Sequence, residues 1–361
     1  MDRKKVLIGM SGGVDSAAAA VLLQQAGYEA VGCTLRLYQN DDMDREEENG
    51  CCSLEDVEDA RAVAAKLEMD FYAFNFKELF RRCVMDEFVA SYQAGRTPNP
   101  CIQCNRHIKF DALLRRADEL GIDYIATGHY ARVGYDESRG RWQLLRGKDR
   151  RKDQSYVLYP LTQEQLSRLK MPVGEYEKSE IRAIAEEQGL INAHKKDSQD
   201  ICFIPDGDYA AFLQRYGGVE LMPGEFVDTA GKVLGQHKGL ECYTTGQRRG
   251  LGVSADRPLY VLGKDAETNR VILGDEKELY SRTVWAEDFN WISVAPPEEP
   301  LTVTAKTRYS QNEAVATLYP EENGRVRVVF DQPQRAVTAG QALVAYDGEA
   351  VVGGGTICAW E

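Results

Sequence analysis

Short apolar runs alternate with segments of helical periodicity over the first part of the chain, up to residue 205. The apolar runs predict strands at residues 6–10, 30–37, 71–74 and 124–127. The periodic segments predict helices at residues 16–26, 54–67, 79–92, 110–120 and 178–188. Strands that alternate with helices are typical of an α/β domain with a parallel sheet, so residues 1–205 are predicted to form one.

The rest of the chain changes its pattern twice. Residues 206–280 are rich in glycine, contain short strand-like runs such as 259–262 and 271–273, and are predicted to form a small central domain. From residue 281 onward, apolar and polar positions alternate in runs such as 301–305 and 326–330. Turn residues separate these runs at regular spacing, which predicts a C-terminal β-barrel over residues 281–361.

The charge of the chain does not by itself indicate a nucleic-acid partner. The formal net charge is −13, whereas proteins that bind phosphates usually present a basic surface. Acidic residues are concentrated at 41–49, and basic residues gather at 146–152, 195–196 and 248–249. These basic groups could equally be ordinary surface charge. Any RNA binding therefore has to be argued from motifs.

Composition also bears on where the protein acts. No stretch reaches the ~20 apolar residues that span a bilayer, and no signal peptide is recognised. The nine cysteines are an odd number in a chain of 361 residues, which favours reduced thiols over a disulfide framework. We expect a cytoplasmic protein without a membrane partner, in which any disulfide is transient and catalytic.

A glycine-rich string lies where the first strand should turn into the first helix, and it reads Gly9-Met10-Ser11-Gly12-Gly13-Val14-Asp15-Ser16. Adjacent glycines let the backbone curl around an anion, and the following helix directs its N–H groups at phosphates. Ser11 and Ser16 can add hydroxyl donors, whereas Asp15 would act through Mg²⁺. The string resembles the pyrophosphate loop of ATP pyrophosphatases, which implies cleavage of ATP between its α and β phosphates. The alternative is an ordinary glycine-rich turn, but such a turn would need only the adjacent glycines and not the full string.

Two cysteines, Cys101 and Cys104, lie in a segment that is bounded by prolines and is predicted to be a rigid loop before helix 110–120. Because Cys104 is close to the start of that helix, the helix dipole is expected to lower its thiol pKa. Half of a zinc site would need a second Cys or His pair, which the sequence does not supply. A thioredoxin-like motif and buried structural thiols remain alternatives. Cys202 lies in an apolar run, where a lone cysteine is usually a core residue.

Several motifs in the same order resemble the tRNA-specific 2-thiouridylases (MnmA/TrmU type) along nearly the full chain. Beyond the string that ends at Ser16, they are residues 95–100 with 104–105, 108–110, 127–130, 152–156, 197–198 with 201–204, 246–251 and 308–309. One position departs from the family pattern, because Cys101 stands where the family often has Asp. Several independent motifs are much more specific than any one of them.

The resemblance implies a three-domain enzyme that thiolates the wobble uridine in the anticodon loop of tRNA. Its cofactors would be ATP and Mg²⁺, and a cysteine desulfurase or a sulfur-relay protein would donate a persulfide. ATP would contact the glycine-rich string, Leu35 and Gly128. The target base would touch Asn99, Pro100 and Cys101. The other tRNA contacts that the resemblance implies are His129, Lys152, Asp153, Gln154, Arg308, Tyr309 and Gln341.

The mechanism that follows from the resemblance uses adenylation and two thiols. ATP adenylates the C2 oxygen of the uridine, Cys202 carries the persulfide, and Cys104 acts as its partner nucleophile. Either Cys104 frees sulfide from the persulfide at the base, or the persulfide attacks C2 directly. AMP departs and a Cys104–Cys202 disulfide remains, while Cys101 is expected to be dispensable.

Two other functions stay open at this point. A pyrophosphate-loop ligase that forms an amide or a guanidine would use the same loop but would not need the two thiols. A non-enzymatic RNA-binding protein would rely on the barrel and would leave the nucleotide loop unexplained.

Overall fold

The computed structural model describes residues 3–38, 54–195 and 201–361. The acidic run at 41–49 and part of the motif at 197–198 with 201–204 lie outside these residues. The first part of the chain forms a five-stranded sheet in the order β3-β2-β1-β4-β7, and all its pairings are parallel. Its strands are β1 (Lys5–Gly9), β2 (Glu29–Arg36), β3 (Phe71–Asn75), β4 (Tyr124–Ala126) and β7 (Leu169–Lys170). The predicted parallel α/β domain is confirmed.

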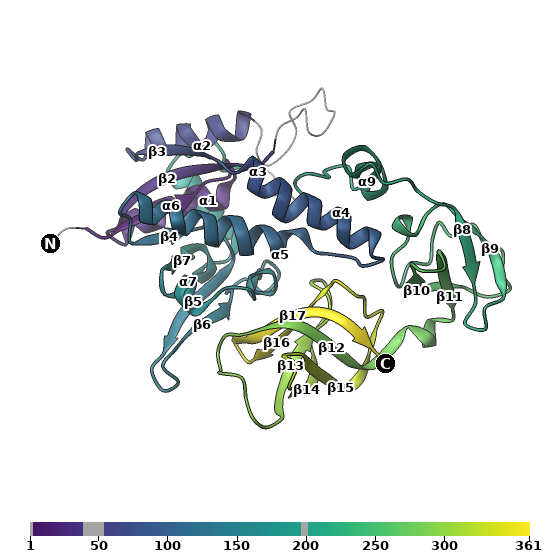
Figure 1. Ribbon diagram of the computed structural model, residues 1–361. Helices are drawn as coiled ribbons and strands as arrows, with labels where there is room; N and C mark the ends of the chain where they lie inside the picture. Colours follow the sequence, from purple (N-terminus) through teal and green to yellow (C-terminus); the bar gives the residue numbers. More distant parts are fainter. Residues whose placement is uncertain (1–2, 39–53, 196–200) are drawn as a thin grey trace.

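Helices cover both faces of this sheet, as Figure 1 shows. The middle of the central strand β1 is fully buried, with Val6 and Ile8 packing on one face and Leu7 on the other. Alternate burial of successive side chains is what a strand between two helical layers requires. The first face is covered by α1 (Val14–Gln25), α2 (Leu54–Lys66) and α8 (Lys178–Glu187). The second face is covered by α6 (Leu113–Glu119) together with η3 (Asn105–Ala112).

Two long helical rods run side by side across the centre of Figure 1. One consists of α3 (Lys77–Phe80), η2 (Arg81–Met85) and α4 (Asp86–Gln93), and the other of α5 (Pro100–Cys104), η3 and α6. The second rod begins ten residues before the predicted helix 110–120, so that predicted start was wrong. The Asn99 side chain accepts a hydrogen bond from the N–H of Cys101 (3.1 Å), and Pro100 occupies the first helical position. Asn followed by Pro therefore starts a helix here instead of holding a loop open.

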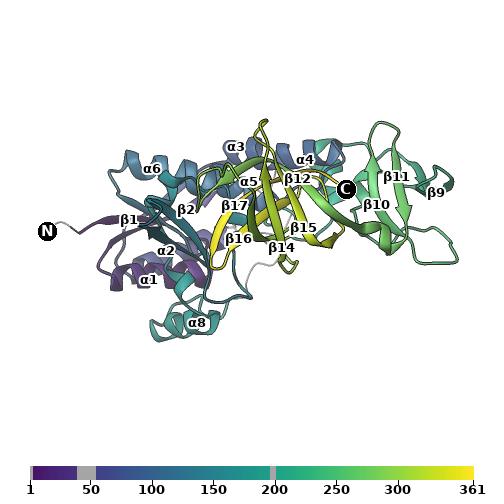
Figure 2. The same ribbon diagram turned by 90° about the horizontal axis from the view of Figure 1, so that it is seen from below.

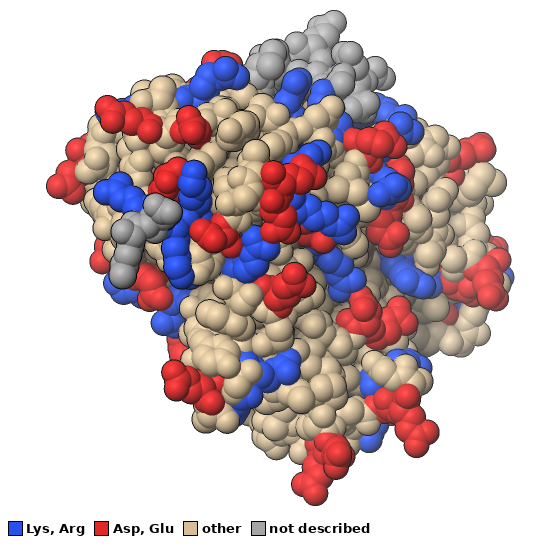
Figure 3. Space-filling view, turned by 60° about the vertical axis from the view of Figure 1, so that its left-hand side comes forward, with Lys and Arg blue, Asp and Glu red and all other residues tan. Residues whose placement is uncertain are grey.

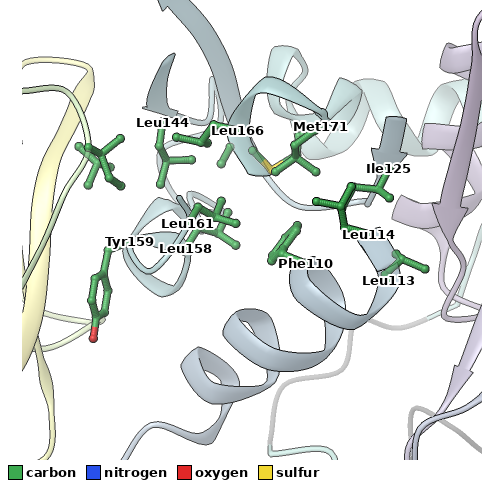
Figure 4. Packing of buried hydrophobic residues seen from close by; sticks show 14 of the residues in the cluster. Phe110, Leu113, Leu114, Ile125, Leu144, Leu158, Tyr159, Leu161, Leu166 and Met171 are labelled. Carbon is green, nitrogen blue, oxygen red and sulfur yellow. The ribbon is translucent and has the colours of Figure 1, made fainter. Parts of the chain in front are cut away.

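A large apolar cluster fixes the second rod against the rest of the domain (Figure 4). Phe110 of the rod lies near Leu158, and Leu114 of the rod lies near Met171; all four side chains are buried. Burial of side chains of this size stabilises the fold by about 1.5–3 kcal/mol each. The rod that carries Cys104 is thus held rigidly. The short elements around the cluster are η4 (Ser155–Leu158), α7 (Gln163–Ser167) and η5 (Pro172–Glu175).

The predicted small central domain is built around a four-stranded sheet in the order β10-β11-β8-β9. Its elements are α9 (Tyr209–Gly217), β8 (Gly224–Val227), β9 (Val233–His237), η6 (Leu240–Cys242), β10 (Tyr260–Asp265) and β11 (Arg270–Gly274). The predicted strand runs at 259–262 and 271–273 fall on β10 and β11. In both Figure 1 and Figure 2 this part lies at the end of the molecule away from the N-terminus.

The C-terminal part forms the predicted barrel, whose six strands close through the pairing of β12 with β17. After η7 (Glu276–Leu279), the strands are β12 (Tyr280–Trp291), β13 (Leu301–Lys306), β14 (Ala314–Pro320), β15 (Val326–Arg335), β16 (Ala342–Asp347) and β17 (Ala350–Trp360). The hairpin of β5 (Ala131–Asp136) and β6 (Arg141–Arg146) extends the barrel sheet, since Leu145 pairs with Ala350. The sequence analysis did not predict this hairpin, because its charged residues obscure the alternation of apolar and polar positions.

Hydrogen bonds across the parts hold the barrel against the sheet domain. Tyr156 donates to the carbonyl of Ala342 (2.7 Å), and Asn290 donates to the carbonyl of Tyr159 (2.6 Å). Figure 2 shows the barrel strands in front of the helical rods. Among the helices of the described residues, none is long and apolar enough to cross a membrane.

Candidate active site

The glycine-rich string forms a preshaped loop at the carboxyl end of β1. Gly13 is the N-cap of α1, and no side chain caps the helix within the described part of the chain. Gly12 has φ of +73°, and a Cβ there would lie 2.7 Å from the carbonyl oxygen of Asp56, so only glycine fits. The Ser16 hydroxyl accepts a hydrogen bond from the N–H of Ser11 (3.2 Å) and donates to the carbonyl of Gly13 (3.0 Å). Exposed first-turn N–H groups next to a fixed loop are the features that bind phosphate.

Asp15, in the first turn of α1, is held by two side chains from distant parts of the sequence. The Lys178 ammonium lies 2.7 and 2.9 Å from its two carboxylate oxygens, and the Tyr130 hydroxyl donates to Oδ1 (2.8 Å). Lys178 begins α8, and Tyr130 follows β4. Sequence reasoning missed Lys178, because no local pattern relates residues 163 positions apart. Tyr130 lies in one of the motifs that resemble the family, but the sequence analysis assigned it no role.

Other residues that were predicted to contact ATP lie on the same edge of the sheet. Gly128 follows β4, and a Cβ there would lie 2.8 Å from the backbone N of Ser16, so glycine permits this close approach. Leu35 lies near the carboxyl end of β2 and packs, partly buried, beside Phe74. The carboxyl ends of parallel strands are where α/β sheets usually bind ligands.

The segment after α8 contacts the backbone of the glycine-rich loop. The Asn192 side chain donates to the carbonyls of Gly12 (3.1 Å) and Gly13 (3.2 Å). Nearby, Lys195 bonds to Asp56 at 2.8 Å, on the helix that Gly12 touches. The contacts of Asn192 hold the carbonyls of Gly12 and Gly13 in place. Sequence reasoning also missed Asn192, which stands outside every motif.

The candidate thiols gather around one apolar cluster. Cys104 is buried in it, and Cys202 packs against it partly buried, beside Phe203. The Tyr38 hydroxyl donates to the carbonyl of Cys202 (2.8 Å). Cys101 is exposed in the first turn of α5. The structure therefore brings Cys104 and Cys202 to the same cluster, although they are 98 positions apart in the sequence.

The expected effect of the helix dipole on Cys104 was wrong. Burial raises the pKa of the Cys104 thiol to about 11, while the nearby charge of Lys109 acts in the opposite direction. Cys104 is the fifth residue of α5, beyond the first turn in which the dipole acts. The exposed first-turn position belongs to Cys101. In this arrangement Cys104 is a neutral thiol at physiological pH.

A short segment lies between the nucleotide loop and the surroundings of Cys101. Gln154 accepts a hydrogen bond from the N–H of Tyr130 (2.9 Å), the residue that contacts Asp15. The neighbouring carbonyl of Asp153 accepts one from the Tyr309 hydroxyl (3.1 Å). Burial raises the pKa of Tyr309, and the nearby thiol of Cys101 acts in the same direction. Residues that were predicted to contact tRNA thus lie between the nucleotide loop and Cys101.

Three other predicted tRNA residues make internal contacts. Nδ1 of His129 lies 2.8 Å from the Thr127 hydroxyl, and burial lowers the pKa of this histidine well below its usual range. A neutral imidazole can give a hydrogen bond to RNA but no charge. Gln341 donates to the carbonyl of Thr97 (2.8 Å), just before the N-cap of α5. Arg308 binds three oxygens, which belong to Thr245 (2.9 Å), Ala336 (2.8 Å) and Thr338 (2.6 Å).

The basic cluster at 146–152 is largely paired with acidic groups. Arg146 is buried, lies over the ring of Tyr346 and bonds to Glu313 at 2.5 Å. Lys148 pairs with Glu180 at 3.0 Å. On the face shown in Figure 3, basic and acidic side chains are interspersed. The cluster therefore contributes less positive potential than its sequence indicates.

The fold and the site define a class: a parallel-sheet domain with a glycine-rich loop before its first helix and two cysteines at one apolar cluster, followed by a central part and a barrel. Family models described as "tRNA methyl transferase HUP domain", "tRNA methyl transferase PRC-barrel domain" and "Aminomethyltransferase beta-barrel domain" match residues 4–206, 210–275 and 281–357. The tRNA-specific 2-thiouridylase MnmA of Acetivibrio thermocellus is 52% identical over 99% of this chain and 100% of its own length. The chain therefore belongs to the tRNA-specific 2-thiouridylase family.

A second curated relative agrees with this placement. The tRNA-specific 2-thiouridylase MnmA of Moorella thermoacetica is 52% identical over 97% of this chain and 98% of its own length. A solved complex of a 4-thiouridine synthetase with RNA and bound ATP is a distant similarity, with a TM-score of 0.37 and 18% identity. It covers 59% of this chain and 50% of that chain.

Proposed function

We propose that this protein is an ATP-dependent tRNA-uridine 2-sulfurtransferase that acts on the wobble uridine of the anticodon loop. The observation that carries the proposal is that one domain combines a glycine-rich loop of the phosphate-binding type with two thiols on one apolar cluster. A ligase that forms an amide would have no use for the thiols, and a purely RNA-binding protein would have no use for the loop. The full-length similarity to curated 2-thiouridylases supports the same function.

The first step activates the base. The loop N–H groups at the start of α1 bind the phosphates of ATP, and the C2 oxygen of the uridine attacks the α phosphorus, so that pyrophosphate leaves. The base is then an O-adenylated uridine whose AMP group leaves more easily than oxide. Asp15 offers two carboxylate oxygens, which are ligands that Mg²⁺ prefers, so this residue would hold the ion. When bound, Mg²⁺ would offset the charge of the phosphates.

The second step transfers sulfur. The terminal sulfur of a persulfide on Cys202 attacks C2, and AMP leaves with the C2–O electron pair. The Cys104 sulfur then attacks Sγ of Cys202, so a Cys104–Cys202 bond forms as the Cys202 S–S bond breaks. The electron pair of the broken bond stays on the sulfur attached to C2 and gives the thiocarbonyl. An external thiol afterwards reduces the disulfide.

The buried thiol of Cys104 makes a further step necessary. At neutral pH the group is protonated, because burial raises its pKa to about 11. It must lose its proton before it attacks Cys202, and Lys109, whose charge lowers that pKa, favours the thiolate. Docking of an RNA loop that moves Cys104 toward water would have the same effect.

The donor of the persulfide sulfur is proposed to be a cysteine desulfurase or a sulfur-relay protein. Cys202 is only partly buried, so a donor thiol has a route to it, whereas Cys104 is closed off. Since tRNA, ATP and such donors meet in the cytoplasm, we propose that the protein acts there.

The decisive experiment incubates the protein with tRNA, ATP, Mg²⁺ and a persulfide donor. Nucleoside mass spectrometry should detect 2-thiouridine, and AMP should form in equal amount. The matched control is the double variant with Cys104→Ser and Cys202→Ser, which should form no 2-thiouridine. If that variant were fully active in an ATP-dependent reaction, the ligase alternative would replace this proposal.

A further inference from the structure

The hydroxyl group of Tyr130 contacts the nucleotide loop from the segment that follows β4, and the proposed mechanism gives it no role. It donates a hydrogen bond to Oδ1 of Asp15 (2.8 Å), a carboxylate that the Lys178 ammonium also contacts. The Asp15 side chain is 30% exposed, so water could solvate the carboxylate without help from a tyrosine. The Tyr130 hydroxyl is therefore not needed to offset burial of a charge, and its effect is to hold the carboxylate in one orientation.

The main chain of Tyr130 is held in both directions by Gln154. The N–H of Tyr130 donates to Oε1 of Gln154 (2.9 Å), and the carbonyl of Tyr130 accepts a hydrogen bond from the N–H of Gln154 (2.9 Å). The Tyr130 ring is buried in the apolar cluster that includes α1 and α8. A Cβ at Gly147 would lie 2.7 Å from the Tyr130 carbonyl oxygen, so glycine permits this close packing. Tyr130 thus presents its hydroxyl from a fixed base.

The turn that carries Gln154 is in turn braced by the side chain of Asp153. Its Oδ1 accepts hydrogen bonds from the N–H groups of Gly147 (3.0 Å) and Ser155 (3.1 Å). Its Oδ2 accepts one from the Ser155 hydroxyl (2.8 Å). Asp153 and Gln154 therefore support Tyr130 from within the segment that was predicted to contact tRNA.

The orientation of Asp15 matters because of the ion that it is proposed to hold. Mg²⁺ demands near-ideal octahedral geometry, so a carboxylate that binds it has to present an oxygen at a set angle and distance. Hydrogen bonds from neighbouring residues to a ligating carboxylate supply this orientation. A tyrosine hydroxyl occupies one lone pair of Oδ1 and leaves other lone pairs of the carboxylate for a cation. Because the hydroxyl is neutral, it orients Asp15 without cancelling its charge.

We propose that Tyr130 is a positioning residue of the nucleotide site, whose hydroxyl orients the Asp15 carboxylate for the metal ion that accompanies ATP, while Gln154 fixes Tyr130 in place. The proposal rests on the proposed use of ATP and Mg²⁺ at this loop. It gives Gln154 a task in the nucleotide site that does not depend on RNA. The alternative is that the Tyr130 hydroxyl only satisfies a hydrogen bond at the edge of the core.

Two ATP affinities separate these roles. Equilibrium dialysis measures the dissociation constant of ATP from the tRNA-free protein, once with Mg²⁺ and once with EDTA, and the quotient of the two constants gives the contribution of the metal ion. Y130F keeps the ring and should reduce this quotient by roughly tenfold or more, while binding in EDTA stays nearly unchanged. Equal weakening in both solutions would mean that the hydroxyl only shapes the loop. That result or an unchanged quotient overturns the proposal.

A double-mutant cycle tests whether Tyr130 acts through Asp15. D15N should lower the same quotient, and Y130F should lower it no further in the D15N protein. A further loss in that background would show that the hydroxyl acts elsewhere and would overturn the proposal. The matched control is Y156F, which removes a buried hydroxyl that donates to the carbonyl of Ala342 (2.7 Å) and should leave the quotient unchanged. An equal loss in Y156F would mean that the quotient follows general loosening of the fold, and the proposal would fail.

The part of Gln154 is tested by Q154M, which keeps a side chain of similar size but offers no acceptor to the Tyr130 N–H. The quotient should fall in the tRNA-free protein, whereas a residue that only contacts RNA would leave it unchanged, and that result would overturn the role of Gln154. Thermal unfolding checks that each variant folds. If Y130F does not fold, Q154M tests the same positioning through the main chain of Tyr130.

The same measurements keep this proposal apart from the proposed function. If the natural protein binds no ATP in either solution, the proposed function itself fails. If it binds ATP equally tightly with Mg²⁺ and with EDTA, the nucleotide site stands and only the positioning role of Tyr130 is overturned.

Discussion

The nucleotide loop and the thiol cluster differ in how ready they are for chemistry. The loop is preshaped, with Ser16 bonded across it and Gly12 in a conformation that only glycine adopts easily. The thiol cluster is closed, because Cys104 is buried among aromatic rings and protonated. ATP can therefore meet a prepared site, whereas sulfur transfer needs a change around Cys104. We therefore predict that RNA docking affects the sulfur step more than it affects the binding of ATP.

The largest expected effect tests the thiol side of this comparison. Replacing either Cys104 or Cys202 with Ser should lower 2-thiouridine formation by about 10³-fold or more, because each sulfur takes part in a bond change. The matched control is C101D, which should leave the reaction largely intact. After one turnover without reductant, peptide mapping should find Cys104 linked to Cys202. A Cys101–Cys202 link together with an active C104S protein would contradict this assignment of roles.

The next effect tests the loop side. Asp15→Ala should reduce AMP and pyrophosphate formation in the presence of tRNA by roughly 10²–10³-fold, because metal and phosphates lose their geometry. The fold should persist, since Asp15 lies partly exposed at the start of α1. Unfolding followed by circular dichroism is the control for folding. Normal turnover by a folded D15A protein would mean that the loop is not the ATP site.

A third prediction compares the reactivity of the two cysteines on α5. Because burial raises the pKa of Cys104 to about 11, its thiolate fraction should rise about tenfold per pH unit from pH 7 to 10. Its rate of alkylation by iodoacetamide in the RNA-free protein should rise in the same way. Cys101, which is exposed, should react faster at pH 7. Mass spectrometry of the peptides measures both rates in one sample. Fast alkylation of Cys104 at pH 7 would show that the cluster is open without RNA.

The smallest effect concerns the segment of residues 152–154, near the nucleotide loop. Affinity for tRNA should fall with salt, and Lys152→Ala should weaken binding modestly and reduce the salt slope by about one. The control is Lys148→Ala, because Lys148 is paired with Glu180 and should change the slope little. Filter binding across a salt series measures both slopes. Affinity that does not vary with salt would exclude electrostatic docking at this segment.

Local sequence determined much of the site. The string from Gly9 to Ser16 predicted a phosphate loop between strand and helix; the structure has a loop between β1 and α1, and phosphate binding there stays a prediction. Strand and helix positions followed from apolar periodicity, because burial against a sheet imposes that periodicity. Asn99 followed by Pro100 also carried the signal for a helix start, although we interpreted that signal as a loop.

Only the tertiary structure decided which distant residues meet. The pairing of Lys178 with Asp15 and the meeting of Cys202 with the cluster around Cys104 join segments that no local pattern relates. The protonation of Cys104 follows from its burial, and burial depends on packing that a spacing of residues does not reveal. The addition of the β5–β6 hairpin to the barrel sheet likewise depends on a strand edge that exists only once the chain has folded.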